Sequence, residues 1–109
     1  MNFNVVYTNE FKKELKRLSK KYPSLPSDFS AFLQHISENP FSGTSLGNKC
    51  YKVKLAIKSK GKGKSGGARI ITYVQIIEET VILISIYDKS ALSSISEAEI
   101  KERLKKHLG

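Results

Sequence analysis

The N-terminal part of the chain shows hydrophobic patterns of two kinds. Residues 2–7 are β-prone and lack helical periodicity, which predicts a short strand. Two stripes at helical spacing follow: Phe11, Leu15, Leu18 and Tyr22 form the first, and Leu25, Phe29, Phe32, Leu33 and Ile36 form the second. Thr8 is a good N-cap for the first helix, Pro23 ends it, and Asn39-Pro40 ends the second. Two helices with a short connection predict an αα-hairpin that covers one side of a sheet.

A strict alternation of hydrophobic and polar residues begins at Tyr51 and predicts a strand. Its period of two places Tyr51, Val53, Leu55 and Ile57 on a buried face and Lys52, Lys54, Ala56 and Lys58 on a face toward solvent or a ligand. Two largely apolar strands are expected to follow at residues 68–77 and 80–87, joined by Glu78-Glu79. The middle of the chain therefore predicts three successive strands.

Two segments are predicted to be loops, and one more helix closes the chain. Residues 41–49 are rich in Ser, Gly, Thr and Asn, and the lysine-glycine run at residues 60–67 is expected to be mobile and extended. Ser96 and Glu99 form a capping box that starts the last helix. The predicted order is β-α-α-β-β-β-α. It indicates a single α+β domain over residues 1–109, with a four-stranded, mostly antiparallel sheet and the N-terminal helical hairpin on one face.

The composition indicates a soluble protein with a polyanionic partner. A net charge of +9 and a pI near 9.7 point to nucleic acid, an anionic membrane surface or an acidic protein. No stretch approaches the about 18 apolar residues of a spanning helix, and the N-terminus lacks the layout of a signal peptide. Cys50 is the only cysteine, which excludes an internal disulfide and suits a reducing cytosol. We therefore expect a cytoplasmic protein without a membrane partner.

The cations are concentrated where acids are absent. No Asp or Glu occurs between Glu38 and Glu78, whereas Lys49, Lys52, Lys54, Lys58, Lys60, Lys62, Lys64 and Arg69 do. Such a surface suits a polyanion, and the predicted RNA-binding residues are Lys49, Lys52, Lys60, Lys62 and Lys64. We interpret the cations of the first helix as a solvated helix face rather than an RNA contact; they are Lys12, Lys13, Lys16, Arg17, Lys20 and Lys21.

Several kinds of catalytic or cofactor site lack their residues in this chain. The lysine-glycine run matches neither G-x-x-x-x-G-K-[ST] nor G-x-G-x-x-G, and no His/Cys cluster has zinc spacing, so no cofactor or metal is expected. Cationic side chains can hold a phosphodiester and stabilise the charge that develops as it is cleaved. A lysine crowded by other cations can act as a general base. Since RNA carries an internal nucleophile, its 2′-hydroxyl, cleavage needs no metal.

Three stretches of sequence carry a resemblance to a known family, namely the strand Y-K-V-K-L-A-I-K, the run S-K-G-K-G-K-S-G-G-A-R-I-I and the later S-I-Y-D-K-S. Together with the element order, they resemble the RelE/ParE superfamily. More closely, they resemble the RelE/HigB-type toxins of bacterial type II toxin–antitoxin systems, over residues 3–104. The resemblance implies a fold similar to microbial RNases. It also implies a metal-independent endoribonuclease that enters the ribosomal A site, cleaves mRNA and so inhibits translation, and a cognate antitoxin that holds it inactive.

The resemblance also implies a catalytic set, which comprises Lys54, Lys58, Arg69, Tyr87 and Lys89. Arg69 matches the family's phosphate-binding arginine and is assigned to the charge that develops on the phosphate. Lys54 or Lys58, on the basic strand, is the expected base, and Tyr87 or Lys89 is expected to orient the nucleotide or assist the leaving oxygen. The family's second arginine on the last strand is absent, so Lys89 or Arg103 is expected in its place.

Two other functions fit the same composition. A ParE-like protein would poison DNA gyrase without nuclease activity and would not need the cationic strand or Tyr87. A catalytically inactive module would only bind RNA or an antitoxin. For the nuclease, the partners would be the ribosome with its rRNA, the mRNA and the antitoxin. Free RNA is expected to be a poor substrate, because lysines on an open sheet hold phosphates without fixing the in-line angle of the 2′-oxygen.

Overall fold

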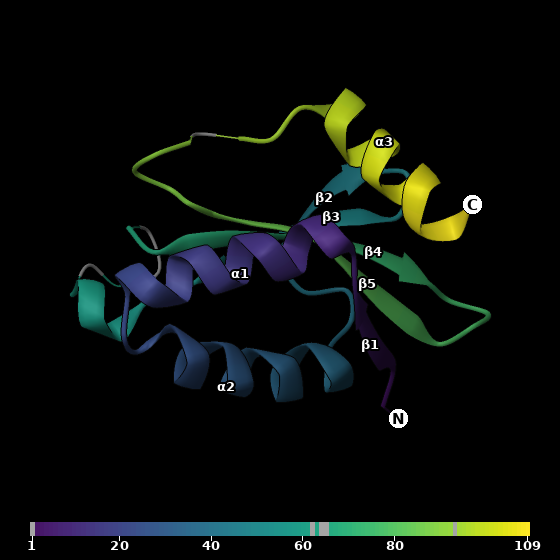
Figure 1. Ribbon diagram of the computed structural model, residues 1–109. Helices are drawn as coiled ribbons and strands as arrows, with labels where there is room; N and C mark the ends of the chain where they lie inside the picture. Colours follow the sequence, from purple (N-terminus) through teal and green to yellow (C-terminus); the bar gives the residue numbers. More distant parts are fainter. Residues whose placement is uncertain (1, 62, 64–65, 93) are drawn as a thin grey trace.

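The structure, a computed structural model, describes residues 2–61, 63, 66–92 and 94–109 and contains one five-stranded sheet in the order β1-β5-β4-β3-β2 (Figure 1). The strands are β1 Asn4–Tyr7, β2 Thr44–Gly47, β3 Cys50–Leu55, β4 Ala68–Gln75 and β5 Thr80–Asp88. The helices are α1 Asn9–Lys21, α2 Leu25–Glu38 and α3 Glu97–Leu108, with a short 3-10 helix, η1, at Lys58–Lys60. β1 runs parallel to β5, and the other neighbouring strands are antiparallel. The expected α+β class is confirmed.

Helices cover both faces of the sheet (Figure 1). α1 and α2 pack on one face, where Phe11, Leu25 and Ile36 are fully buried in the larger hydrophobic cluster. On the other face Ile100 of α3 packs with Ile71 in a smaller cluster. The expected N-terminal hairpin on one face is confirmed, and each face of the sheet has its own core.

The polar caps that the sequence predicts begin α1 and α3. The Thr8 hydroxyl accepts a hydrogen bond from the Phe11 backbone N–H at 3.1 Å and donates to the Ile84 carbonyl at 3.1 Å. It therefore starts the helix and fixes that start to β5. The Ser96 hydroxyl accepts from the Glu99 backbone N–H at 3.1 Å, as a capping box requires.

The predicted four-stranded sheet is wrong, because β2 forms where a loop was expected. Thr44 pairs with Lys52 in the antiparallel register of β2 and β3. Asn48 and Lys49 join the two strands with φ of 51° and 64°, the left-handed pair of a type I′ hairpin turn. All four residues of β2 are exposed, so no hydrophobic alternation marks the strand and only its backbone pairing defines it. The observed order is β-α-α-β-β-η-β-β-α.

β3 ends earlier than its alternation suggests. Val53 and Leu55 are buried under the helices as predicted, whereas Tyr51 is only half-buried. The strand stops at Leu55 and the chain turns into η1, so Lys58 does not continue the row of Lys52 and Lys54. The predicted common face for these three lysines is wrong at Lys58, because a period of two holds only while the backbone stays extended.

β4 also stops early, at Gln75. Ile77 was expected within the strand but lies in the turn to β5, with 93% of its surface exposed. Within the described part of the chain, none of the helices combines the length and the apolar character needed to cross a membrane.

Candidate nucleic-acid interface

Three of the predicted catalytic residues lie side by side on the face of the sheet that carries α3. Lys54 on β3 is opposite Arg69 on β4, and Arg69 is opposite Tyr87 on β5. Opposite residues of antiparallel strands share a face with Cα atoms about 4.5–5.5 Å apart, so this row crosses three strands in roughly 10 Å. Lys89 follows just after the end of β5. We call Lys54, Arg69, Tyr87 and Lys89 the sheet site.

The sheet site has two exposed and two buried members. Lys54 and Lys89 are exposed, whereas Arg69 is 5% and Tyr87 4% exposed. An Arg69 Nη1 N–H donates to the Ala68 carbonyl at 3.1 Å. Within the described structure the buried Tyr87 hydroxyl has no hydrogen-bond partner. A buried polar group without a partner costs about 1–3 kcal/mol, so the Tyr87 hydroxyl is unfavourable for stability.

The other predicted RNA-binding lysines are dispersed. Lys52 lies one row away from Lys54 on the same face, and its Nζ donates to the Ser94 hydroxyl at 3.3 Å. Lys49 is exposed in the turn between β2 and β3. Lys62 and Lys64 lie outside the described residues.

Lys60 does not lie on the exposed cationic surface. Its Nζ is 2.5 Å from Asp88 Oδ1 and donates to the Ser90 hydroxyl at 3.0 Å. The side chains of Lys60 and Asp88 are only 9% and 3% exposed. The Tyr22 hydroxyl donates to the other Asp88 oxygen at 2.5 Å. Lys60 is therefore committed to a buried ion pair, and its expected RNA contact has no support from this geometry.

The electrostatics of Asp88 follow from the same contacts. Burial raises the pKa of the Asp88 carboxyl, but hydrogen bonds from Lys60, Tyr22 and Ser90 outweigh it and hold the pKa well below its usual range. Asp88 thus stays ionised and joins η1 and the end of α1 to the end of β5.

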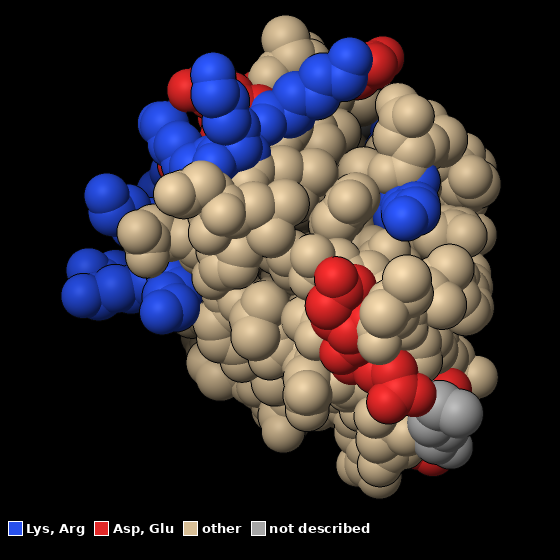
Figure 2. Space-filling view, turned by 90° about the vertical axis from the view of Figure 1, so that its right-hand side faces the viewer, with Lys and Arg blue, Asp and Glu red and all other residues tan. Residues whose placement is uncertain are grey.

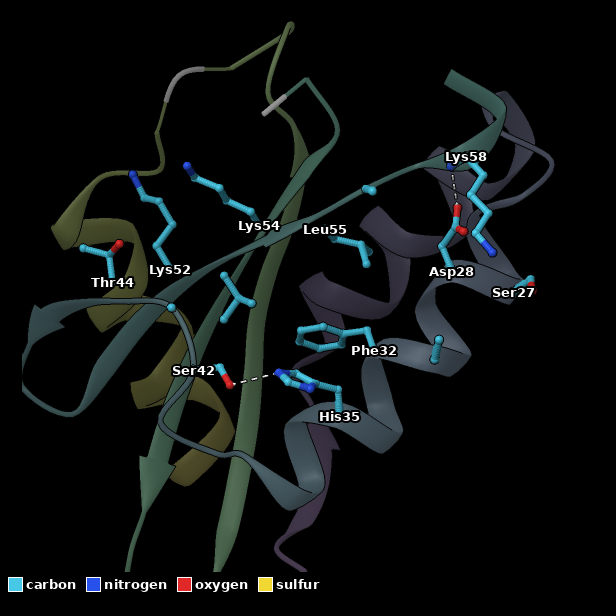
Figure 3. Close-up of a pocket in the computed structure, with 14 residues that line it drawn as sticks. Ser27, Asp28, Phe32, His35, Ser42, Thr44, Lys52, Lys54, Leu55 and Lys58 are labelled. Carbon is cyan, nitrogen blue, oxygen red and sulfur yellow. Dashed lines mark hydrogen bonds between the residues drawn. The ribbon is translucent and has the colours of Figure 1, made fainter. Parts of the chain in front are cut away.

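Lys58 borders a groove of about 560 Å³ between α2 and β3 (Figure 3). Its backbone N–H donates to Asp28 Oδ2 at 3.0 Å. Phe32 and Leu55 line the groove, while the side chains of Lys52 and Lys54 point away from these residues (Figure 3). The two expected base candidates, Lys54 and Lys58, both line this groove, but only Lys54 also lies in the row with Arg69 and Tyr87.

Arg103, the expected substitute for a second arginine, is held at the edge of β5. Its Nη1 and Nη2 donate to the two carboxylate oxygens of Glu14 at 2.9 and 3.0 Å, and its Nε donates to Glu99 at 2.8 Å. Burial lowers the pKa of the Arg103 guanidinium, but the hydrogen bonds to both glutamates outweigh this and raise it. Glu14 also accepts from the Ile86 backbone N–H at 3.2 Å. Arg103 therefore fastens α3 to α1 and β5, and Lys89 is the exposed candidate.

Two carboxylates that the sequence analysis did not single out, Glu14 and Asp88, thus decide which cations are available. The only signal for Asp88 is its position at the end of an apolar strand, where a carboxylate needs a partner. Among the residues that the structure describes, no group of three His, Cys, Asp or Glu side chains is placed to hold a metal ion.

Comparison with known proteins identifies the fold. A scan against protein-family models found no match. A solved structure of the Escherichia coli toxin RelE, an arginine mutant in the free state, is similar with a TM-score of 0.64 and 20% identity, covering 97% of this chain and 98% of that chain.

Two toxin–antitoxin complexes are similar as well. The intact E. coli RelBE complex matches with a TM-score of 0.61 and 20% identity over 79% of this chain and 95% of that chain. The Mycobacterium tuberculosis RelBE2 complex matches with a TM-score of 0.57 and 12% identity, over 81% and 92%. The chain therefore has the RelE toxin fold, as the resemblance in its sequence implied.

Proposed function

We propose that this protein is the toxin of a type II toxin–antitoxin system and acts in the cytoplasm by cleaving mRNA in the ribosomal A site. The observation that carries the proposal is the row Lys54, Arg69 and Tyr87 at matching positions of three neighbouring strands. Two cations and a hydroxyl on one face are suited to hold a phosphodiester and to stabilise its developing charge. The similarity to RelE toxin structures supports the same assignment.

The proposed reaction uses the 2′-hydroxyl of the RNA as its nucleophile and the side chains of the sheet site as its catalytic groups. The 2′-oxygen of the mRNA attacks the adjacent phosphorus, the bond from phosphorus to the 5′-oxygen of the next nucleotide breaks, and a 2′,3′-cyclic phosphate remains. Lys54 takes the proton of the 2′-hydroxyl, since it lies next to Arg69 whereas Lys58 lies beside α2. Arg69 stabilises the charge on the phosphate, and Tyr87 or Lys89 supplies a proton to the leaving oxygen.

The burial of Arg69 and Tyr87 fits a site that is closed in the free protein. RNA that approaches from solvent meets Lys54 and Lys89 first, because these are the exposed members of the sheet site. Binding on the ribosome would have to bring the phosphate to Arg69 and fix the in-line angle of attack. Free RNA is then a poor substrate, as expected, but because Arg69 and Tyr87 are buried and not because the sheet is open.

The decisive experiment adds the purified protein to a translating extract and maps mRNA ends by primer extension. The proposal expects new 5′ ends within translated codons and none in untranslated RNA. A gyrase poison or an inactive RNA-binding module yields no new ends.

The single-turnover rate at saturating ribosomes tests the site itself. Arg69→Ala should lower this rate about 10²-fold or more, because it removes a preorganised cation, while ribosome binding largely survives. Wild-type rates for both Arg69→Ala and Tyr87→Phe would end the nuclease assignment.

A cognate antitoxin is the proposed protein partner, in line with the toxin–antitoxin complexes among the similar structures. β2 begins at Thr44, opposite Lys52, so the outer edge of β3 from Val53 to Leu55 borders the groove beside α2 without a neighbouring strand among the described residues. Lys54 and Lys58 flank this edge, which suits an acidic segment lying along the cationic strand. The rate of association with the neighbouring gene product should fall as salt rises. A rate that stays flat would exclude electrostatic capture.

A further inference from the structure

We propose that the outward face of α1 is a second nucleic-acid-binding surface, which docks on the phosphates of double-helical RNA. The α1 surface consists of Lys12, Lys13, Lys16, Arg17 and Lys20, all of which are exposed. α1 packs on the sheet face opposite the one that carries the sheet site. The α1 surface is thus separate from the proposed cleavage site and does not depend on cleavage; only the choice of RNA over DNA rests on the proposed function.

The tertiary structure sorts the charges of α1 by side. The helix has two acidic residues, and both face α3: Glu14 binds Arg103 at 2.9 Å, and Glu10 lies 3.8 Å from Lys106. At 3.6 residues per turn, the five cations fall within an arc of roughly 140°. This arc lies away from the buried Phe11 side of the helix. The five cations therefore share the outward side of α1 with no acidic residue of the helix.

The cations of the α1 surface have no acidic partner among the described residues, since none of the five forms an ion pair there. Lys12, Lys16 and Lys20 follow one another at i,i+4 spacing, where each like-charge pair destabilises a helix by about 0.2–0.5 kcal/mol. A bound polyanion would relieve this repulsion between the lysines, whereas on a face that only contacts water the repulsion lowers helix stability without any compensation.

The side chains of the α1 surface select the kind of polyanion. The arc contains no aromatic residue on which unpaired bases could stack, and no aliphatic residue that could insert into a membrane. Cations without such neighbours contact phosphates rather than bases. The surface from Lys12 to Lys20 is roughly 12 Å long, and an A-form RNA helix presents a wide, shallow minor groove, so the two ends of the surface can reach phosphates on both strands.

The distribution of charge over the molecule supports docking of α1 on phosphates. Figure 2 shows most Lys and Arg side chains of this face along the upper and left side of the view, at the height at which Figure 1 places α3 and α1, with a few Asp and Glu side chains among them at the top and one further basic group at the right. Asp and Glu side chains form a separate group lower on the same face (Figure 2). This asymmetry would orient α1 toward a phosphate backbone before contact is made.

The test measures binding of the full-length protein to a short labelled RNA duplex over a series of salt concentrations, without ribosomes. The variant Lys16→Gln/Lys20→Gln removes two charges from the α1 surface. The control Lys101→Gln/Lys105→Gln removes two exposed charges from α3 and gives the same net charge. The first variant should bind on the order of 10–10²-fold more weakly near 0.1 M salt, and the slope of log K against log salt should become about 2 smaller in magnitude. The control should change the binding constant and the salt slope by less than half as much as the first variant does.

Three outcomes overturn the inference. Equal losses in the two variants would mean that only total charge matters. Equal losses for single-stranded RNA and for the duplex would remove the preference for a double helix. Binding to anionic lipid vesicles that is lost in the same variant would assign the surface to a membrane. Duplex binding needs no cleavage, so a protein that binds the duplex through α1 but does not cut mRNA would overturn only the proposed function, and one that cuts mRNA without α1-dependent duplex binding would overturn only this inference.

Discussion

Lys60 and Asp88 form a buried ion pair between two positions 28 residues apart, with Nζ and Oδ1 separated by 2.5 Å. Asp88 directly follows Tyr87 of the sheet site, and Lys60 begins the lysine-glycine run. The pair therefore holds η1, at the start of that run, against the end of β5. Removing one partner of a buried ion pair costs about 3–5 kcal/mol, because the other charge stays buried without compensation.

Stability should depend on pH through Asp88. The folded pKa of its carboxyl is depressed below the unfolded value of about 3.9, so its contribution is present above that pH and is lost as pH falls toward the folded pKa. In urea unfolding at pH 6 and at pH 3, the difference in unfolding free energy between wild type and Asp88→Asn should shrink at the lower pH. An equal difference at both pH values would show that the ionised carboxylate is not what stabilises this junction.

The Arg103–Glu14 contact should anchor α3. Replacing Arg103 by Gln removes charged hydrogen bonds to Glu14 and should lower the unfolding free energy by about 1.5–3 kcal/mol. Hydrogen exchange of the α3 amides should accelerate with it. The matched control is Lys101→Gln, which removes an exposed ion pair to Glu97 and should cost about 0.5 kcal/mol or less. Similar effects of the two substitutions would contradict the anchor.

Tyr87→Phe should separate stability from activity. Its hydroxyl is buried without a partner in the described structure, so removing it should leave the unfolding free energy unchanged or raise it by about 1 kcal/mol. The cleavage rate on ribosomes should nevertheless fall, if the hydroxyl acts on the leaving oxygen. Thr72→Val is the control, because the Thr72 hydroxyl is also buried and unpartnered there but lies three positions farther along β4 than Arg69, opposite Leu83. Thr72→Val should be as stable as the wild type and fully active. A loss of activity equal to that of Tyr87→Phe would mean that disturbed packing, and not a missing catalytic hydroxyl, lowers the rate in both variants.

Gly67 should tolerate no side chain. A Cβ atom there would lie 2.2 Å from the Leu55 carbonyl oxygen and 3.1 Å from the Ile57 backbone nitrogen, and backbone atoms cannot yield as a side chain can. Gly67→Ala should cost about 1–3 kcal/mol and push β3 away from β4, which separates Lys54 from Arg69 and lowers cleavage. Gly61→Ala meets no atom within 4 Å, although φ of 73° adds strain of about 1–2 kcal/mol. It should keep its cleavage rate, and a loss as large as that of Gly67→Ala would reject the steric argument.

Much of the fold follows from residues that are close in sequence. The apolar spacing from Phe11 to Tyr22 predicts α1, and the hydroxyls of Thr8 and Ser96 predict where α1 and α3 begin, because capping is a contact between residues a few positions apart. Alternation from Tyr51 predicts β3 because each strand position has only two possible faces. The sequence did not predict β2, because all four of its residues are exposed and a fully exposed strand shows no alternation of hydrophobic and polar residues.

The sequence by itself therefore determined the helices, the long strands and the presence of an excess of cations. Only the tertiary structure decided which of these cations are available to a partner. Lys60 and Arg103 look like any other basic residue in the sequence, but the fold brings Asp88 and Glu14 against them. Ion pairs of this kind depend on which elements the sheet order places side by side, and that order joins residues far apart in the chain. The same tertiary contacts turn the acids of α1 toward α3 and leave its outer side with cations and no acidic residue.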